Sequence, residues 1–207
     1  MALRYETKMT WKSAKFDQAI RDGQYYQWRF GQRELDFDWE RCLRLLDTHM
    51  KNKVGGNVNK NNFQLLDCRK RGSLPKQLKE MCAQLDTKFH KNDVSLICFG
   101  SIGPNSKSFN IHRDNMDVIY MQGLGEVDLS IWEGVEGAKL VDNLDHGDRS
   151  SVRQIFKKRF KKYDIIWIPR GTYHLIEPVG SRVGFSFGIE GGLGKQTSAY
   201  HDPKDYI

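Results

Sequence analysis

A small antiparallel β-sandwich with helices packed on it, most simply a jelly roll, is the fold that the sequence predicts. After Asp93 the chain contains six short segments that are rich in β-branched and aromatic residues and are separated by Gly, Pro or Asn/Asp clusters. Such segments are typical of short strands. The first part of the chain instead has apolar residues at spacings of three and four, which indicates amphipathic helices. Together these patterns predict a mainly β fold with N-terminal helices.

One domain is expected for the whole chain. Its 207 residues are enough to bury a single core, and neither an internal repeat nor a linker divides them. We therefore expect residues 1–207 to form one domain, in which a helical part, 1–92, packs on a β-core, 93–190.

The composition predicts a cytoplasmic protein that does not enter a membrane. Hydrophobic residues make up 39% and aromatic residues 12% of the chain, as in globular proteins. No stretch approaches the roughly 18 apolar residues of a membrane helix, and the first residues lack the apolar core of a secretory signal. The four cysteines lack CxxC spacing and are expected to be reduced, semi-buried thiols: Cys42, Cys68, Cys82 and Cys98. The net charge of +7 favours acidic partners without identifying one.

Two helices are expected in the first part of the chain. The first spans 36–51, capped by Asp36 or Asp38, and the second begins near Ser73 with Pro75 in its first turn. We expect both to pack on the outer face of the β-core through one apolar face, namely Trp39, Leu43 and Leu46 on the first helix and Leu78, Met81 and Leu85 on the second.

The strands are expected mostly after Asp93. A polar, Gly- and Asn-rich segment, 51–62, is predicted to be a loop, and 63–68 a short strand. Six further strands are predicted at 94–100, 118–122, 127–132, 163–169, 172–177 and 182–189. Only residues 150–160 show a competing helical pattern.

Two residues at strand spacing suggest a metal site. His112 and Asp114 are separated by one residue, so on a strand both side chains point to one face, about 6–7 Å apart along the chain. His174 is well placed to supply a third ligand, and two histidines with one carboxylate form the facial triad of non-haem Fe(II) oxygenases. The alternative is a surface His112 beside a turn-forming Asp114, with His174 as a hydrogen-bonded core residue.

The segments around these residues resemble the JmjC-type cupin oxygenases, especially the ribosomal-oxygenase and asparaginyl-hydroxylase-like branch. That pattern is HxD, then a Gln, a Gly and a Trp at the end of the next strand, and later an aromatic-Ile-Pro-x-Gly-x-x-His segment. The matching residues are His112, Asp114, Gln122, Gly125, Trp132, Trp167, Ile168, Pro169, Gly171 and His174. The resemblance covers about 95–189.

The resemblance implies a double-stranded β-helix, the cupin form of a jelly roll, that binds Fe(II) through His112, Asp114 and His174. It also implies 2-oxoglutarate as cosubstrate and a hydroxylation reaction, with a protein side chain as the expected substrate. Asp117 matches a common polar position and is expected to orient the site. The remaining histidines have no partner at ligand spacing and are expected at the surface: His49, His90, His146 and His201.

One departure from the family concerns 2-oxoglutarate. The family usually places a Lys or Arg for the distal carboxylate five residues after the Gln, and this position is Val127. Arg182 is the best substitute, and Ser186 and Tyr120 could add hydrogen bonds. In the competing arrangement Arg182 points outward and its alternate neighbours fill the core: Val183, Phe185 and Phe187. Val127 also keeps open a second function, a non-catalytic cupin-fold binding or structural module.

A basic run in the second half of the chain has two interpretations. Residues 149–162 include seven Lys and Arg and no acidic residue. They could form a solvated helix face, with Phe156 and Phe160 on its buried side, or a patch for an anionic partner such as RNA, DNA or an acidic protein surface.

Overall fold

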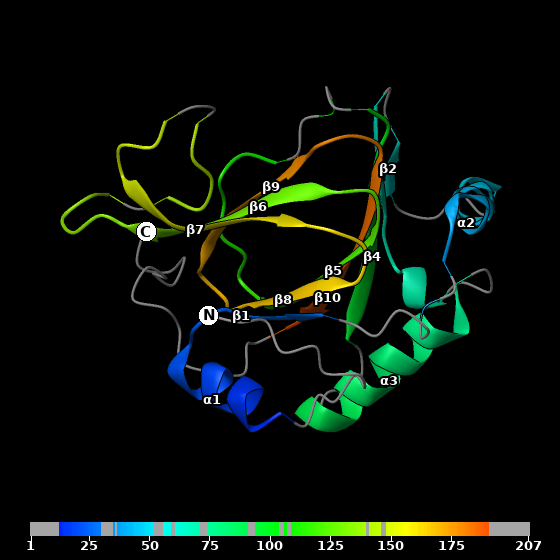
Figure 1. Ribbon diagram of the computed structural model, residues 1–207, viewed down its shortest axis with the longest axis horizontal. Coiled ribbons are helices and arrows are strands. Elements are labelled where there is room, and N and C mark those ends of the chain that lie inside the picture. Colours follow the sequence, from blue (N-terminus) through cyan, green and yellow to red (C-terminus); the bar gives the residue numbers. More distant parts are fainter. Residues whose placement is uncertain are drawn as a thin grey trace.

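The computed structural model describes most of the chain between Ser13 and Glu190 (Figure 1). The described residues are 13–29, 35, 37–51, 56–58, 61–70, 74–90, 94–103, 106, 109–139, 141–145 and 148–190. Their helices are α1 (Ala14–Asp22), α2 (Trp39–Lys51) and α3 (Lys76–Phe89), with a 3-10 turn η1 (Cys68–Lys70). Their strands are β1 (Tyr26–Arg29), β2 (Gly56–Val58), β3 (Asn62–Leu65), β4 (Ser95–Ser101), β5 (Asp117–Leu124), β6 (Val127–Gly134), β7 (Val152–Phe160), β8 (Asp164–Ile168), β9 (Tyr173–Pro178) and β10 (Arg182–Ile189).

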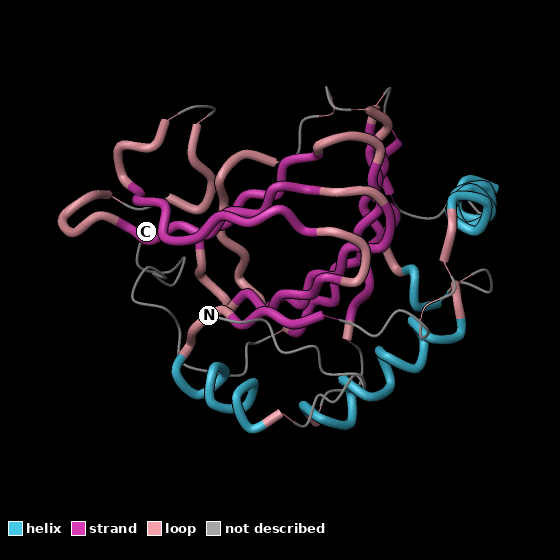
Figure 2. Tube along the Cα trace, in the orientation of Figure 1, coloured by secondary structure: helices cyan, strands magenta, loops and turns pink. Residues whose placement is uncertain are grey.

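These strands form two antiparallel sheets that face each other (Figure 2). The larger has the order β1-β8-β5-β10-β4-β3-β2, and the smaller has the order β7-β6-β9. The space between them is filled from both sides, by Val118, Tyr120, Ile166 and Ile168 of the larger sheet and by Val127, Leu129, Ile131 and Phe160 of the smaller one. The predicted mainly β jelly roll is confirmed.

Helices α1 and α3 cover the outer face of the larger sheet (Figure 1). The predicted contacts of α3 are present, because Leu78, Met81 and Leu85 are all buried. They join one continuous core with Ile119 of β5 and Phe185 of β10. The larger sheet is therefore buried on both faces, one against the helices and one against the smaller sheet.

The predicted packing face of α2 is wrong in part. The helix is capped as expected, since the Arg41 backbone N–H donates to Asp38 at 2.8 Å, and Leu46 packs against the core. Trp39 and Leu43, however, are 41% and 62% exposed. The buried row is instead Cys42, Leu45 and His49, so the surface position expected for His49 is wrong as well. Spacings of three and four fit both rows of this helix, and the pattern alone could not select between them.

Strand β7 replaces the helix considered for 150–160. Phe160 is buried and Phe156 is half-buried, in line with the predicted buried side, because residues four apart share a face in a strand as well as in a helix. Three further elements were not located from the sequence: helix α1, strand β1, and strand β2 within the predicted loop 51–62.

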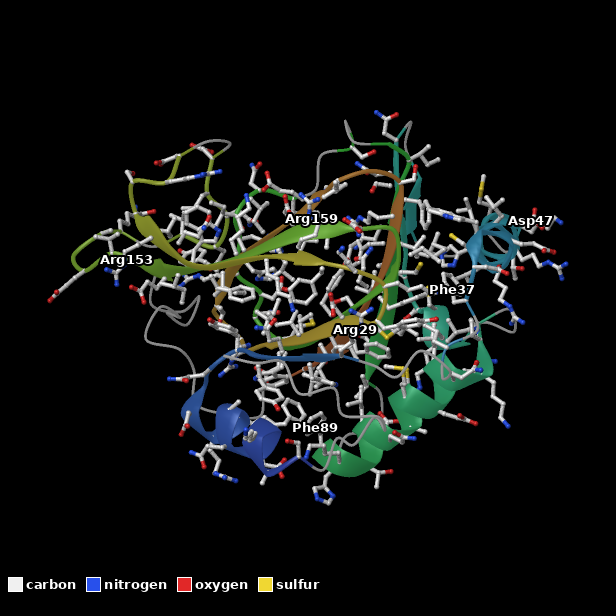
Figure 3. The ribbon with its side chains drawn as sticks, viewed as in Figure 1. Arg29, Phe37, Asp47, Phe89, Arg153 and Arg159 are labelled. Atoms are coloured by element: carbon white, nitrogen blue, oxygen red, sulfur yellow. The ribbon has the colours of Figure 1, made fainter. Side chains whose placement is uncertain are left out.

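Many of the basic side chains of β7 and its flank pair with acidic side chains of or beside β6. Arg153 pairs with Glu133, and Arg159 pairs with Asp128 at 2.6 Å. Figure 3 labels the two arginines. Lys161 lies 3.7 Å from Glu126, just before the same strand. The hydrogen bond from Arg159 lowers the pKa of Asp128. The charge on this surface is thus partly neutralised by cross-strand pairs.

Among the described helices, none is long and apolar enough to cross a membrane.

The shared core predicts one cooperative unfolding transition, because residues of α1 and α3 contact the larger sheet within a single cluster. Calorimetry on the full chain should give a van't Hoff enthalpy equal to the calorimetric one. A separate transition of residues 1–92 would contradict the single-domain prediction.

Candidate active site

Two backbone hydrogen bonds bring two of the candidate ligands together. The His112 N–H donates to the His174 carbonyl at 3.2 Å, and the His174 N–H donates to the His112 carbonyl at 2.8 Å. His112 lies on the segment that leads into β5, whereas His174 is the second residue of β9. Because the two residues are direct cross-strand partners, their rings lie side by side, with centroids 4.3 Å apart.

Asp114 completes the group from the same segment as His112. Its two carboxylate oxygens lie 3.7 Å from Nε2 of His112 and 3.6 Å from Nε2 of His174. All three ligating atoms fall within 4.8 Å of one another. Two imidazoles and one carboxylate at this spacing can hold one Fe(II)-like ion and leave other coordination positions open.

Each imidazole is oriented by a backbone carbonyl. Nδ1 of His112 lies 2.8 Å from the carbonyl of Asn110, and Nδ1 of His174 lies 3.0 Å from that of Thr172. A carbonyl can only accept, so each Nδ1 carries the proton and each Nε2 presents a lone pair to the centre. Burial, together with the neighbouring His112, lowers the pKa of His174 to about 4. His174 is therefore neutral at pH 7, as a metal ligand must be.

The loop before His174 is fixed by the residues that follow His112. The Arg170 N–H donates to the Asp117 carboxylate at 2.7 Å, and the Gly171 N–H donates to the Asp114 carbonyl at 2.9 Å. Gly171 has a φ of 80°, which favours glycine. Asp117 does not belong to the metal group and instead holds this loop.

Arg182 is buried beside Tyr120 on the inner face of the larger sheet. Arg182 is 5% exposed. Tyr120 is the direct cross-strand partner of Ser186, and Arg182 lies four residues before Ser186 on the same strand, so all three predicted residues share this face. Burial raises the pKa of Tyr120, while the Arg182 guanidinium acts in the opposite direction. Gly184 leaves the room for this arrangement, since a Cβ there would lie 2.3 Å from the Tyr120 hydroxyl oxygen.

The Arg182 guanidinium lacks a carboxylate partner in the described part of the chain. Its Nε has no hydrogen-bond partner, while its other nitrogens reach the Phe99 carbonyl at 3.5 Å and the Tyr120 hydroxyl. The competing outward arrangement assumed that the core lies on one face only. The structure instead has apolar contacts on both, because Val183, Phe185 and Phe187 fill the helix-covered face while Arg182 points to the interior.

Two features near the site were not predicted from the sequence. Lys158 faces the interior, opposite Leu129, and its Nζ donates to Gln27 of β1 at 3.1 Å. Phe109 is 54% exposed, and its ring centroid lies 5.5 Å from that of His112. Its place three residues before His112 was the available signal for Phe109, and Lys158 was masked by the helical interpretation of its segment.

The comparisons with known proteins identify the family and the fold. The family model of the JmjC domain matches residues 76–195, more than half of the chain. The chain belongs to the JmjC-domain family. This confirms the family resemblance seen in the sequence. No curated protein matches the chain significantly.

Several solved structures share the fold. An X-ray structure of Escherichia coli ycfD is 15% identical, with a TM-score of 0.63, over 91% of this chain and 54% of that one. A structure titled as the ribosomal oxygenase YcfD with cobalt and 2-oxoglutarate has the same identity and TM-score, over 98% and 55%. A third, with cobalt and succinic acid, is 15% identical with a TM-score of 0.58, over 89% and 53%. The JmjC-domain chain described here thus spans about half the length of the YcfD chains.

The lowered pKa of His174 predicts a pH dependence of the metal-free protein. In the unfolded chain this histidine takes up its proton near pH 6.5, but in the folded chain only near pH 4. The folded state binds fewer protons between these values, so the free energy of unfolding falls as the pH decreases from about 6.5 to about 4, by about 3 kcal/mol at most. The free energy of unfolding, measured by denaturant titration at several pH values in this range, should depend more steeply on pH in the wild type than in His174→Asn. An equal pH dependence in the two proteins would contradict the lowered pKa of His174.

Proposed function

We propose that this JmjC-domain chain is an Fe(II)- and 2-oxoglutarate-dependent oxygenase that hydroxylates its substrate. The observation that carries the proposal is that two candidate binding sites face the space between the two sheets. One is the group His112, Asp114 and His174, and the other is the buried Arg182 guanidinium without a carboxylate partner.

The first site fits a divalent iron. Each Nε2 lies within 3.7 Å of an Asp114 oxygen, so the three ligands already surround one position. Holding the Nδ1 protons on backbone carbonyls keeps the imidazoles from rotating away. These three residues would bind the metal, and Asp117 would hold the loop that presents His174.

The second site fits the distal carboxylate of 2-oxoglutarate. A buried guanidinium is costly unless an anion pairs with it, and a carboxylate can accept two parallel hydrogen bonds from it. Tyr120 and Ser186 share this face and offer hydroxyl groups, so we propose Arg182, Ser186 and Tyr120 as the binding residues. Gly184 leaves the room that the Tyr120 side chain occupies on this face.

The chemistry would come from the bound groups, since iron with 2-oxoglutarate and O2 supplies an oxidant for C–H bonds. The residues of the chain would bind and orient them, and the apolar lining between the sheets, including Val127 and Ile131, would exclude water.

A protein side chain is the proposed substrate. The structures of similar fold include one titled as a ribosomal oxygenase. The exposed Phe109 ring beside His112 offers an apolar surface next to the metal group, and a substrate side chain could pack against it. We also propose a cytoplasmic location, in keeping with the four buried cysteines, which form no disulfide.

The basic segment 149–162 supports an anionic partner less than its composition suggests. Arg153, Arg159 and Lys161 are engaged by acidic residues of or beside β6, and Arg149 lies over the Trp132 ring at 4.9 Å. A patch for RNA, DNA or an acidic protein would have to compete with these pairs.

A non-catalytic cupin-fold module is the second candidate function. Val127, at the usual position of the family's cation, is fully buried against the apolar interior and offers no charge. Anaerobic Fe(II) titration with and without 2-oxoglutarate tests the two functions. The oxygenase predicts a weak visible charge-transfer band only when both are present, and conversion of 2-oxoglutarate to succinate when O2 is admitted. Iron binding without either result would favour the module.

Arg182→Ala should leave Fe(II) binding nearly unchanged and weaken 2-oxoglutarate binding by about 10-fold to 1,000-fold, as expected for loss of a charge-assisted contact. Calorimetric titration of the metal-loaded protein measures it. Lys158→Ala is the matched control, because Lys158 is a second cation facing the interior. If Lys158→Ala lowers the affinity instead, the carboxylate belongs to Lys158 and the assignment of Arg182 is wrong.

A further inference from the structure

The segment that carries His112 and Asp114 is held from its outer side by the connection between β6 and β7. Strand alternation turns Arg113, which lies between the two ligands, away from the metal group. Its side chain is only 1% exposed. Ile111 points to the same outer side, where it packs with Trp132, Tyr173 and Leu175.

Arg113 is bound twice by one residue of that connection. Its backbone N–H donates to the Asp142 carbonyl at 3.0 Å, and its Nε donates to the Asp142 carboxylate at 2.8 Å. The guanidinium also lies over the Tyr173 ring, 5.5 Å from the centroid. Tyr173 directly precedes His174, and Arg113 lies between His112 and Asp114, so this contact links the two segments that carry the ligands.

The same connection also holds the partner strand. The Tyr173 hydroxyl donates to the Val141 carbonyl, and the Leu144 N–H donates to the Ile111 carbonyl at 2.9 Å. His112 is bridged to Asn143 on one side and to His174 on the other. Residues 141–144 therefore act as a third strand beside the ligand segment.

This support matters because the ligand segment has little regular pairing of its own. Within the described residues, His112 meets β9 through an isolated bridge and not through a continuous ladder. The outer bonds to Asp142 and Val141 therefore supply much of what fixes the separation of the ligands. Metal sites need their ligands held within a fraction of an ångström.

We propose that Arg113 and Asp142 are positioning residues for the metal group, and that the β6–β7 connection sets its metal affinity through them. The inference rests on the proposed function only in taking His112, Asp114 and His174 as a metal site. Neither residue touches the metal position. The carboxylate of Asp142 keeps the buried Arg113 charge in place, and Arg113 with Tyr173 fixes the two ligand-bearing segments against each other.

The test is Co(II) binding to the full chain, followed by its visible absorption, together with the melting temperature of the metal-free protein. Asp142→Ala should weaken Co(II) binding by about 10-fold to 100-fold, as for other residues that orient metal ligands. Asp142→Asn keeps an acceptor for Nε and should restore affinity to within a few-fold. Glu133→Ala is the matched control, because the Glu133 carboxylate also pairs with an arginine, Arg153, but forms no hydrogen bond or ion pair with the described ligand-bearing segments.

The proposal is overturned if Asp142→Ala is folded and binds Co(II) like the wild type. It is also overturned if Asp142→Ala and Glu133→Ala lose melting temperature and affinity equally, since the effect would then be general destabilisation. A wild type that binds Co(II) through His174, as shown by loss of binding in His174→Ala, but does not turn over 2-oxoglutarate with iron would reject the oxygenase reaction. That result would leave this inference standing. A wild type that binds no Co(II) would overturn both.

Discussion

The pair of backbone hydrogen bonds between His112 and His174 is the constraint on which the rest of the site depends. His112 lies on the segment that runs into β5 of the larger sheet, and His174 lies on β9 of the smaller one. The pairing therefore joins the two sheets at one point. Because cross-strand partners have neighbouring side chains, this pairing places the two imidazoles side by side, and Asp114 follows from its spacing to His112.

The space between the two sheets is mostly apolar, but it also contains a buried charge that costs electrostatic free energy. Leu129, Ile131 and Ile166 make a packed core, yet Arg182 enters it without a carboxylate among the described residues. A fold selected for stability alone would place an apolar side chain there, since replacing buried charges by apolar groups is often stabilising. A ligand carboxylate would remove that cost, which links the affinity for such a ligand to the stability of the folded chain.

The sequence predicted the parts of the fold that depend on local pattern and missed those that depend on context. The spacing of His112 and Asp114 and the six strands after Asp93 are local features, and the structure has them. The direction of Arg182 was left open because alternation assigns residues to two faces without saying which is buried, and here both are. The row of α2 that meets the core, Cys42 and Leu45, was missed for the same reason. Residues 152–160 form a strand because pairing with β6 outweighs their helical periodicity.

Val127, at the position where the family usually has a cation, does not by itself argue against 2-oxoglutarate binding once the larger sheet is considered. Val127 lies on β6 of the smaller sheet and Arg182 on β10 of the larger one, and both face the space between the sheets. Packed sheets lie about 10 Å apart, so a long side chain from either one can place its charge near the middle. The chemistry of a buried dicarboxylate requires a cation in that space but not a particular strand to carry it. A valine on β6 and an arginine on β10 are therefore compatible with one function, and Gly184, two residues after Arg182, makes room for the Tyr120 side chain on the same face.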